Sequence, residues 1–560
     1  MNNRFDFKIV CHLLALVAVV LSGRIYAQPS VVSVRVNAAQ AGKPLRHVWQ
    51  YYGYDECNYT TTPDCKALMR TVAQINPEPV YLRQHFLLNS GDGIATPKWS
   101  STNVYTEDSS GNPVYDWRIM DGIMDAVTAS GCRPLVEIGL MPKDLSVRPD
   151  PYRPPKPFGP NEGIGVFFPP KDYEKWAELI RQWARRTKDR YENAEETWLW
   201  ELWNEPDIFY FQGTYEDYEK LFEYTEQALH EVMPAAVLGG PHVAGVGKFM
   251  QRFLTHCATE KNSLTGKTGT RLDYIGFHAK GGIDFKEGYV RMSMRGQLEK
   301  HQRGFAMVAS FPEFRNTPII IGEADPDGAA GMPASQSPSR GYRNVPAYGA
   351  YVAAMMKYSL DLAEAEKVNL KGVLTWAFMF DGMPWFDGYR TLATNGIHKP
   401  VLNAFKMLGR LKGNELPLTS DGAVGLDQIL KDSVRARPDI NGMAVADDRS
   451  VKILIWNYHD YLVPAESASI QLKVKLPPDF GSKARVVHYR IDDTHSNAYA
   501  KWLELGSPQN PDAKMLAELK AAMELEMLEP AKLIDINGGE AALNFDLPRS
   551  GLSLIIIEKS

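Results

Sequence analysis

The sequence predicts an α/β fold in which a (β/α)8 barrel is followed by a C-terminal β-sandwich. From about Leu45, apolar strand segments alternate with longer helical segments, which is typical of parallel strands joined by crossover helices. Beyond Pro400 the pattern changes to strands in which apolar and polar residues alternate, which is typical of a sandwich. The 560 residues accommodate a barrel of about 250 residues or more together with a further module. We predict a signal peptide at 1–27, a strand that packs on the sandwich within 28–43, the barrel at 44–412 and the sandwich at 413–560.

The N-terminus has the pattern of a secretory signal peptide. Arg4 and Lys8 precede an apolar run from Ile9 to Leu21, and Ala27 stands before Gln28 at the expected cleavage site. We therefore expect a secreted or periplasmic protein. After Leu21 no apolar stretch approaches the ~20 residues that a membrane-spanning helix needs, so no membrane partner is expected.

Charge and cysteine content restrict the classes of partner. The formal net charge is -5 and no basic block occurs, so nucleic acid is not an expected partner. Cysteines and histidines do not fall at metal-ligand spacing, and no metal or cofactor is expected. Cys57 and Cys65 are close enough in sequence for a local disulfide in an oxidising compartment, which the sequence alone leaves undecided. The oligomeric state is not predicted.

The barrel prediction depends on eight segments with the pattern of buried strands. They are His47–Tyr54, Val80–His85, Leu135–Leu140, Trp198–Trp203, Val237–Gly240, Tyr274–His278, Ile319–Glu323 and Val373–Phe378. Two intervening helices are well marked. One begins at Tyr173 and places Trp176, Leu179, Ile180 and Trp183 on one face; the other runs from Tyr215 to Met233.

The C-terminal segments predict the sandwich. Ala404–Leu411 is expected to be the last barrel helix. Alternating strands follow at Val451–Trp456, Ser469–Leu476 and Leu552–Ile557, and a helical insertion is predicted at 511–527. Val31–Val36 has the same alternation and is expected to join this sandwich.

Two glutamates end two of the predicted barrel strands. Glu205 lies in Asn204-Glu205-Pro206, directly after the fourth strand, and Glu323 ends the seventh. Barrel enzymes place their active sites at the carboxyl ends of the strands, so both side chains are expected on facing sides of the barrel mouth.

A pair of carboxyl groups at one site suits glycoside hydrolysis. In a retaining mechanism one carboxyl protonates the leaving oxygen and the other attacks the sugar. We assign Glu205 as the general acid/base, with a pKa expected to be raised by its aromatic surroundings and nearby negative charge, and Glu323 as the nucleophile. Asn204 is expected to bind the sugar 2-hydroxyl group. The alternative is that both glutamates are ordinary solvated loop residues.

Several motifs together resemble glycoside hydrolase family 39, which contains β-xylosidases and α-L-iduronidases. They are Gly53–Thr60, Arg83-Gln-His85, Trp203–Asp207, Gly239-Gly-Pro241, Phe277-His278, Gly322-Glu323 and Tyr489-Arg-Ile-Asp492. The resemblance implies the same two roles for Glu205 and Glu323, and sugar contacts for His85, Asn204 and His278. The family's Arg-x-His-Gly reads Arg83-Gln-His-Phe86 here, which leaves the contour of that loop open.

Lys280 and Arg390 bear on the kind of sugar. Desolvating the Lys280 ammonium in a sugar site costs several kcal/mol unless it is paired, and a substrate carboxylate would pair with it. The resemblance to α-L-iduronidases implies that Lys280 and Arg390 clamp a uronate, with Asp381 accepting from a hydroxyl group. The alternative is a salt bridge from Lys280 to Asp325, Asp327 or Asp381. Trp376 either forms the floor of the subsite or belongs to the core.

We therefore expect a retaining exo-glycosidase acting on an oligo- or polysaccharide, with selectivity for a uronate as in α-L-iduronidases. The first alternative is a β-xylosidase or related pentosidase that acts on plant hemicellulose. A second alternative is a non-catalytic carbohydrate-binding barrel. The sequence does not determine the sugar, the linkage or whether cleavage is strictly terminal.

Overall fold

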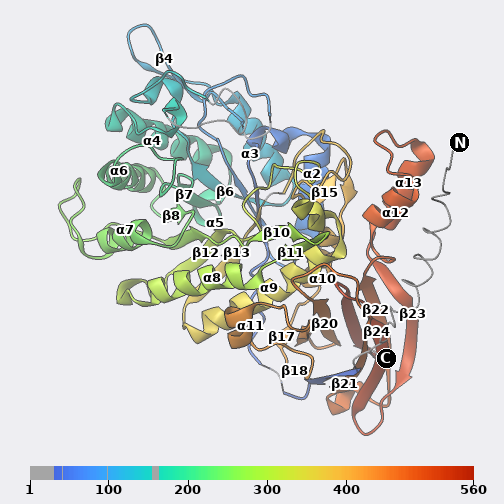
Figure 1. The fold of residues 1–560 in the computed structure, drawn as a ribbon. Coiled ribbons are helices and arrows are strands. Elements are labelled where there is room, and N and C mark those ends of the chain that lie inside the picture. Colours follow the sequence, from blue (N-terminus) through green and yellow to red (C-terminus); the bar gives the residue numbers. More distant parts are fainter. Residues whose placement is uncertain (1–30, 41, 97–98, 154–162, 377) are drawn as a thin grey trace, which may run out of the picture.

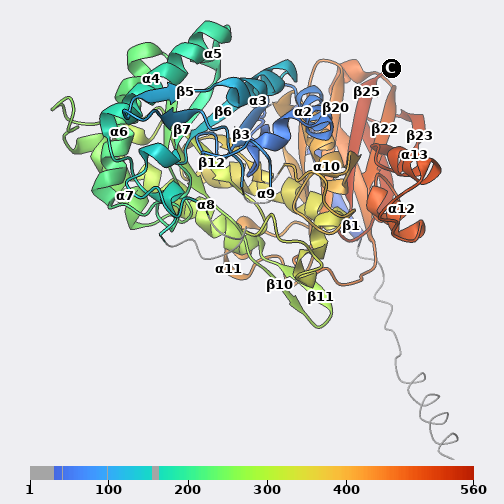
Figure 2. The ribbon, with the colours of Figure 1, turned by 90° about the horizontal axis from the view of Figure 1, so that it is seen from above.

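The computed structural model describes residues 31–40, 42–96, 99–153, 163–376 and 378–560. The predicted signal peptide at 1–27 lies outside these residues. Figure 1 shows a barrel, coloured blue to yellow, beside a region rich in strands, coloured orange and red. The view from above in Figure 2 shows the same two parts side by side.

A parallel sheet forms the nearly closed barrel. Its nine segments follow the order β13-β12-β9-β8-β7-β6-β3-β2-β14. The eighth strand is broken at Leu374, so that β13 pairs with β12 while β14 pairs with β2 and brings the two edges together. The segments are β2 (Tyr51–Tyr54), β3 (Tyr81–Gln84), β6 (Arg133–Ile138), β7 (Leu199–Leu202), β8 (Val237–Val243), β9 (Tyr274–His278), β12 (Pro318–Glu323), β13 (Asn369–Val373) and β14 (Thr375–Trp376). The predicted barrel is thus confirmed.

Helices cover the outside of the barrel; most have one apolar face, whereas Pro346–Ala365 and Pro400–Gly409 are buried nearly all round. They are α2 (Pro63–Ile75), α3 (Arg118–Ala129), α4 (Tyr173–Arg190), α6 (Tyr215–Val232), α7 (Lys248–Thr259), α8 (Met294–Ala309), α9 (Pro346–Ala365) and α10 (Pro400–Gly409). Asp172 caps α4, whose buried face includes the predicted residues Trp176, Leu179, Ile180 and Trp183. A capping box of Thr214 and Asp217 begins α6, the helix that follows the strand bearing Glu205.

Two further sheets pack as a sandwich beside the barrel. One has the order β17-β19-β20-β25-β22-β23 and the other the order β18-β1-β21-β24. Their shared core includes Val34, Ile453 and Leu472. The strands are β1 (Val31–Asn37), β17 (Asn414–Glu415), β18 (Leu418–Ser420), β19 (Asp439–Ala446), β20 (Ser450–Tyr458), β21 (Ala468–Lys475), β22 (Lys483–Ile491), β23 (Glu526–Asp535), β24 (Glu540–Leu547) and β25 (Leu552–Lys559). The N-terminal strand β1 therefore joins the C-terminal sandwich, as its alternation predicts.

Two hairpins and several short helices lie outside the barrel sheet and the sandwich sheets. Two hairpins, β4 (Tyr105–Glu107) with β5 (Pro113–Tyr115) and β10 (Ile283–Lys286) with β11 (Tyr289–Met292), were not predicted. Short helices α11 (Leu426–Asp432), α12 (Ala498–Glu504) and α13 (Ala513–Ala522) belong to the C-terminal part, and α13 lies within the predicted insertion. Cys57 and Cys65 are both buried and free, so this structure does not contain the local disulfide considered above. Among the described residues, no helix combines the length and apolar character needed to traverse a bilayer.

Candidate active site

Glu205 is presented by a sharp turn at the end of β7. The strand ends at Leu202, and Trp203 (φ 66°) and Glu205 (φ 45°) both adopt the left-handed conformation that residues with a Cβ rarely take. The Glu205 amide donates to the His242 carbonyl oxygen at 3.0 Å and fixes the turn against β8. Strained backbone of this kind concentrates at functional sites, where surrounding contacts hold it.

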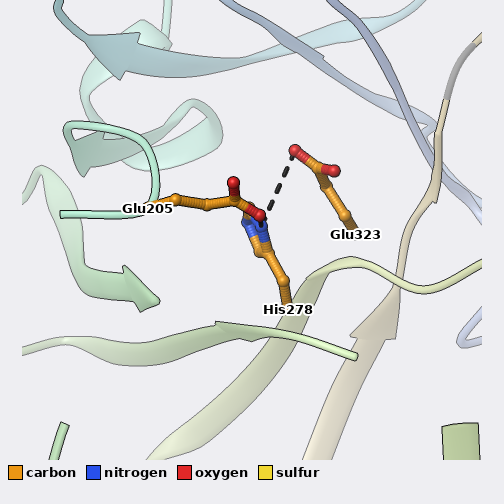
Figure 3. Close-up of side chains that lie close together, drawn as sticks. All are labelled: Glu205, His278 and Glu323. Carbon is orange, nitrogen blue, oxygen red and sulfur yellow. Dashed lines mark hydrogen bonds and ion pairs between the residues drawn. The ribbon is translucent and has the colours of Figure 1, made fainter. Parts of the chain in front are cut away.

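Glu323 is the last residue of β12 and faces Glu205 across the barrel mouth (Figure 3). One carboxylate oxygen of each glutamate and a ring nitrogen of His278 all lie within 4.8 Å of one another. His278 Nδ1 lies 2.8 Å from Glu205 Oε1 and 3.6 Å from Glu323 Oε1. Both glutamates are buried, and each remains slightly exposed at the mouth, by 6% and 3%. The facing arrangement that the sequence predicts is present.

Lys280 places its ammonium group between the two glutamates. Nζ lies 2.9 Å from Glu205 Oε1 and 2.6 Å from Glu323 Oε2. Its side chain is 19% exposed, against 8% and 4% for the two acids, so it lies nearer the opening than either of them. The salt-bridge alternative considered from the sequence named the wrong acids, because Lys280 pairs with the two glutamates and not with Asp325, Asp327 or Asp381.

Lys280 reverses the predicted shift in the pKa of Glu205. Burial raises the pKa of Glu205, but the Lys280 ammonium and the hydrogen bond with His278 outweigh burial and hold the pKa below its ordinary value. Burial likewise raises the pKa of Glu323, but Lys280, His278 and Arg83 outweigh burial and hold this pKa below its ordinary value. The predicted upward shift of Glu205 is therefore wrong for the free protein. Sequence alone did not reveal that the ammonium group would contact this carboxylate.

Arg83 links the acids beneath the mouth. Its fully buried guanidinium contacts Glu201 Oε1 at 2.5 Å, Glu137 Oε2 at 3.1 Å and Glu323 Oε1 at 3.1 Å. Arg83 Nη2 also donates to Asn204 Oδ1 at 3.0 Å, which orients that amide beside Glu205. One guanidinium group thus positions residues from three strands: Glu137 of β6, Glu201 and Asn204 of β7 and its end, and Glu323 of β12.

The pKa values of the three carboxyl groups around Arg83 are shifted in different directions. Burial raises the pKa of Glu137 well above its ordinary value, with Glu201 and Glu323 adding to the effect and Arg83 opposing it. The pKa of Glu201 shifts in the opposite direction, because Arg83 and His242 outweigh burial and lower it. The Arg83 charge therefore helps to lower the pKa of Glu201 and of Glu323, whereas at Glu137 the effect of burial is larger than that of Arg83.

His242 fills the space under His278 and depends on two glycines. Its Nε2 lies 2.8 Å from Glu201 Oε2. A Cβ atom at Gly276 would stand 2.1 Å from His242 Nε2, and one at Gly322 would stand 2.6 Å from His242 Nδ1. The strands that carry His278 and Glu323 can therefore pack around this ring only with glycine at those positions.

His85 and Trp376 form the wall next to Arg83. The two rings lie 4.3 Å apart, and His85 Nε2 contacts Glu137 Oε2 at 3.1 Å. The indole of Trp376 stacks near the Arg83 guanidinium at 5.1 Å and is 2% exposed. Burial and the Arg83 charge lower the pKa of His85. Trp376 lies both beside the site and in the core, which combines the two predicted placements.

The predicted second clamp, Arg390, lies behind this wall. It is fully buried and its guanidinium contacts Asp325 Oδ2 at 3.3 Å and Asp327 Oδ1 at 3.6 Å, together with the carbonyl oxygens of Trp376 and Asp327. Burial raises the pKa of Asp325 to about 7 although Arg390 opposes that shift. Asp381 is half-buried on the loop, and its carboxylate accepts from the Gly382 amide. Neither residue contacts Glu205, Glu323 or Lys280 among the described contacts.

Sequence reasoning assigned no role in the site to Arg83 or Glu201. Glu137 was weighed as a packing residue rather than a sugar ligand, and Asp325 only as a partner of Lys280. Arg83 stood in a recognised motif, and Glu137 and Glu201 each interrupt an apolar strand, which was the available signal. Acids within a buried strand need a partner, and here the partner is one shared arginine.

The site offers two facing carboxyl groups and a cation between them. Glu205, His278 and Glu323 have the atom types and proximity that a metal ion requires, but such an ion would compete with the Lys280 ammonium for the same oxygens. With the lysine displaced, the two carboxyls stand close enough to act on one bond, as a retaining glycosidase requires.

Comparison with known proteins agrees with this geometry. The family model for glycosyl hydrolases family 39 matches residues 32–535. A β-xylosidase of Caldicellulosiruptor saccharolyticus is 25% identical over 457 residues, covering 78% of this chain and 82% of the relative. The α-L-iduronidase of Homo sapiens is 25% identical over 541 residues, covering 89% of this chain and 75% of the relative.

Solved structures share the fold. A family 39 enzyme from Xanthomonas axonopodis pv. citri superimposes with a TM-score of 0.74 at 19% identity, covering 96% of this chain and 100% of that one. A bacterial orthologue of human α-L-iduronidase also gives a TM-score of 0.74 at 19% identity, covering 95% of this chain and 84% of that one. Both therefore support the barrel with its sheet-rich C-terminal part.

Proposed function

Because the chain belongs to glycosyl hydrolase family 39 and is a glycoside hydrolase acting on carbohydrate, we propose that it is a retaining exo-glycosidase selective for a terminal uronic acid. Glu205 is the proposed acid/base and Glu323 the proposed nucleophile. The observation that carries the selectivity is the position of Lys280 Nζ, at 2.9 Å and 2.6 Å from these two carboxylates. The barrel's family membership sets aside the non-catalytic alternative.

The double-displacement mechanism is supported by the spacing of the acids. Retaining enzymes hold their carboxyl groups about 5 to 5.5 Å apart, whereas inverting enzymes leave about 6.5 to 9.5 Å for a water molecule. Oxygens of Glu205 and Glu323 lie within 4.8 Å of each other, which favours direct attack by Glu323. Glu205 protonates the leaving oxygen in the first step and activates water in the second.

A uronate explains how the resting salt bridges are broken. A sugar ring that enters between Glu205 and Glu323 separates both carboxylates from Lys280. A neutral sugar leaves the Lys280 ammonium without a charged partner, at a cost in free energy, whereas a C5 carboxylate of the substrate provides a new one. Once Lys280 turns towards the substrate, its lowering effect on the pKa of Glu205 falls and the acid regains its proton.

The neighbouring side chains have supporting roles in this proposal. Asn204, oriented by Arg83, binds the sugar 2-hydroxyl group, while His85 and His278 contact the ring and Trp376 supports the floor of the subsite. Lys280 is the primary carboxylate ligand. Arg390 and Asp381 contribute only if the loop that bears them rearranges, since Arg390 is held by Asp325 and Asp327.

That arrangement of Arg390 favours a second candidate, a β-xylosidase or related pentosidase. With Arg390 engaged by two aspartates, Lys280 alone remains to bind a uronate. β-Xylosidases also stand among the relatives of comparable identity. The two candidates differ in one group of the substrate, the carboxylate at C5, and a single assay therefore separates them.

The first test compares aryl uronides with aryl xylosides, using wild type and Lys280→Ala. If the uronate proposal is right, the wild type cleaves the uronide with the higher kcat/KM, and Lys280→Ala lowers that value by about 10- to 100-fold, as expected for a charge-assisted hydrogen bond. Cleavage of the xyloside, measured at each variant's own pH optimum, stays within a few-fold. Equal losses on both substrates, or a wild type that prefers the xyloside, would reject uronate selectivity.

Lys286→Ala provides the matched control, because Lys286 is an exposed lysine on the β10 strand that follows Lys280. This variant should leave kcat/KM for both substrates unchanged.

The catalytic roles are tested separately with an activated fluoro-sugar and intact mass measurement. A stable adduct on Glu323 is expected, and its absence in the presence of turnover would contradict the nucleophile assignment.

We also propose that the protein is exported. This rests on residues 1–27 of the sequence alone, with their basic start, apolar run and Ala27. Expression of the full-length chain should yield a mature protein in the periplasm or medium whose first residue is Gln28. A cytoplasmic product that retains Met1 would contradict export.

A further inference from the structure

A second cluster of ionisable side chains lies outside the barrel, between helices α6 and α7. His256 of α7 faces Glu219 and Glu223 of α6, and Glu260 follows the end of α7. The His256 side chain is completely buried, whereas Glu219 is 24% and Glu260 is 50% exposed. The cluster therefore opens to solvent on one side only.

Hydrogen bonds on the inner side fix the orientation of the imidazole. His256 Nε2 lies 3.1 Å from Glu223 Oε1 and 3.2 Å from the Thr270 hydroxyl. Glu223 is held in turn by the Ser263 amide at 2.9 Å and by the Ser263 hydroxyl. An imidazole whose second nitrogen is bound to a carboxylate is the usual arrangement of a metal-ligating histidine.

The other ring nitrogen has no satisfactory protein partner. His256 Nδ1 is buried and makes no hydrogen bond of acceptable geometry within the described structure, although Glu219 Oε1 lies 3.1 Å and Glu260 Oε2 3.5 Å away. If Nε2 carries the proton that Glu223 accepts, Nδ1 presents a lone pair towards two carboxylates. Only a cation, either a proton on Nδ1 or a metal ion, makes that arrangement favourable.

The spacing fits one small metal ion. Nitrogen and oxygen ligands at about 2.1 Å from a tetrahedral zinc ion lie about 3.4 Å from one another. The distances of 3.1 and 3.5 Å from Nδ1 bracket that value, and the three ligand atoms all lie within 4.8 Å of one another. Within the described part of the chain, no lysine or arginine side chain forms an ion pair with Glu219 or Glu260: Arg252, which interacts with Glu219, is hydrogen-bonded to Glu216.

The charge balance also favours a cation. Three carboxyl groups surround one imidazole. Burial raises the pKa of Glu219, and the neighbouring acids Glu260 and Glu223 add to that rise. Burial lowers the pKa of His256, but Glu223 and Glu219 outweigh it, and the net shift is upward. A proton and a metal ion therefore compete for Nδ1.

We propose that Glu219, His256 Nδ1 and Glu260 form a binding site for a divalent transition-metal cation, best matched by zinc, with water completing the coordination. Glu223 is the positioning residue that holds the ring. The ion would join α6 to α7, the helices that follow the strands carrying Glu205 and His242, and would stabilise that side of the barrel. This proposal is independent of the substrate proposed above.

Zinc uptake by the purified enzyme tests the proposal. The full mature chain, with any histidine tag removed, is stripped with a chelator, dialysed against ZnCl2 and analysed for bound metal, with thermal unfolding measured in parallel. One equivalent of zinc and a higher Tm are expected at neutral pH. Affinity should fall as the pH is lowered, because protonated His256 no longer offers Nδ1.

Paired variants locate the metal. Glu219→Gln/Glu260→Gln should weaken zinc binding by more than about tenfold and abolish the Tm increase. The matched control Glu216→Gln/Glu231→Gln also removes two carboxylates, both on α6, and should retain zinc binding and the Tm increase. A further variant, Glu205→Gln/Glu323→Gln, removes the acids of the barrel mouth and should also retain the zinc.

Two results would overturn the proposal. One is the absence of stoichiometric zinc in the wild type, which would leave His256 as a protonated partner of its three acids. The other is zinc that persists in Glu219→Gln/Glu260→Gln and disappears in Glu205→Gln/Glu323→Gln, which would place the ion at the barrel mouth. Each variant's Tm without zinc shows whether it is folded.

Discussion

Lys280 decides the protonation state of the resting site. A general acid must carry a proton when the substrate binds, yet the ammonium that contacts both Glu205 and Glu323 favours their ionised forms. The aromatic surroundings of Glu205 act in the opposite direction by desolvating it. The charge of Lys280, together with the hydrogen bond with His278, outweighs the burial of this carboxylate, and the net shift of the Glu205 pKa is downward.

Removing this charge should move the pH profile. In Lys280→Met, Glu205 loses the cation that lowers its pKa, so its proton is retained to higher pH. The alkaline limb of kcat/KM for an aryl xyloside should therefore shift upward by about one to three pH units relative to wild type. Lys286→Met should leave the limb in place. An unchanged or lower limb in Lys280→Met would show that Lys280 does not control the acid.

Strands β9 and β12 approach His242 more closely than side chains permit. Gly276 and Gly322 leave the space that its ring occupies, and the ring in turn connects Glu201 to the region below His278. The placement of two residues of the site thus depends on positions that carry no functional group. A strand pattern indicates that these segments are buried, but it does not indicate which residue from another strand fills the gap between them.

Gly276→Ala tests this packing. Its Cβ would stand 2.1 Å from His242 Nε2, within a strand that cannot move away, so we expect a loss of about 1 to 3 kcal/mol in the free energy of unfolding and lower activity. Gly282→Ala, which meets nothing within 4 Å, is the control. Urea unfolding measures both. Equal stability of the two variants would mean that the ring has another position available.

The elements were more predictable than the contacts between their ends. The eight barrel strands and helices α4 and α6 follow from apolar periodicity and caps, which are local properties. Glu205 and Glu323 could be placed at the mouth because strand ends of one barrel share an edge. The direction in which the Arg390 side chain points could not be predicted, because it is set by contacts with Asp325 and Asp327 from another loop. Lys280 was expected in the site, but its two partners depend on side-chain reach across the barrel.

The two parts of the molecule are connected by more than their covalent link. Trp456 and Leu554 of the sandwich belong to the same apolar core as the barrel. The barrel packs against the sandwich through helices α9 and α10. The sandwich's own core is completed by β1, which lies between β18 and β21. The stability of the C-terminal part therefore depends on a strand that precedes the barrel.

Val34→Asp should expose this dependence. Val34 is fully buried in β1, and an unpaired carboxylate there should cost about 3 kcal/mol or more, or prevent soluble expression. Arg35→Asp introduces the same side chain on the exposed face of the same strand and should be tolerated. Thermal unfolding and soluble yield compare the two. Similar behaviour of both variants would show that β1 contributes little to the sandwich.

The place of β1 between β18 and β21 has a consequence for synthesis of the chain. Val34 pairs with Ser420 on one side and with Leu472 on the other, so neither neighbour exists when the N-terminal strand leaves the ribosome. The strand must stay unpaired while the whole barrel is made, with an apolar face and a free edge available to other chains. Truncated products that end within the barrel would therefore retain an aggregation-prone N-terminal segment. Only nearly complete translation provides the strands that pair with it and cover it.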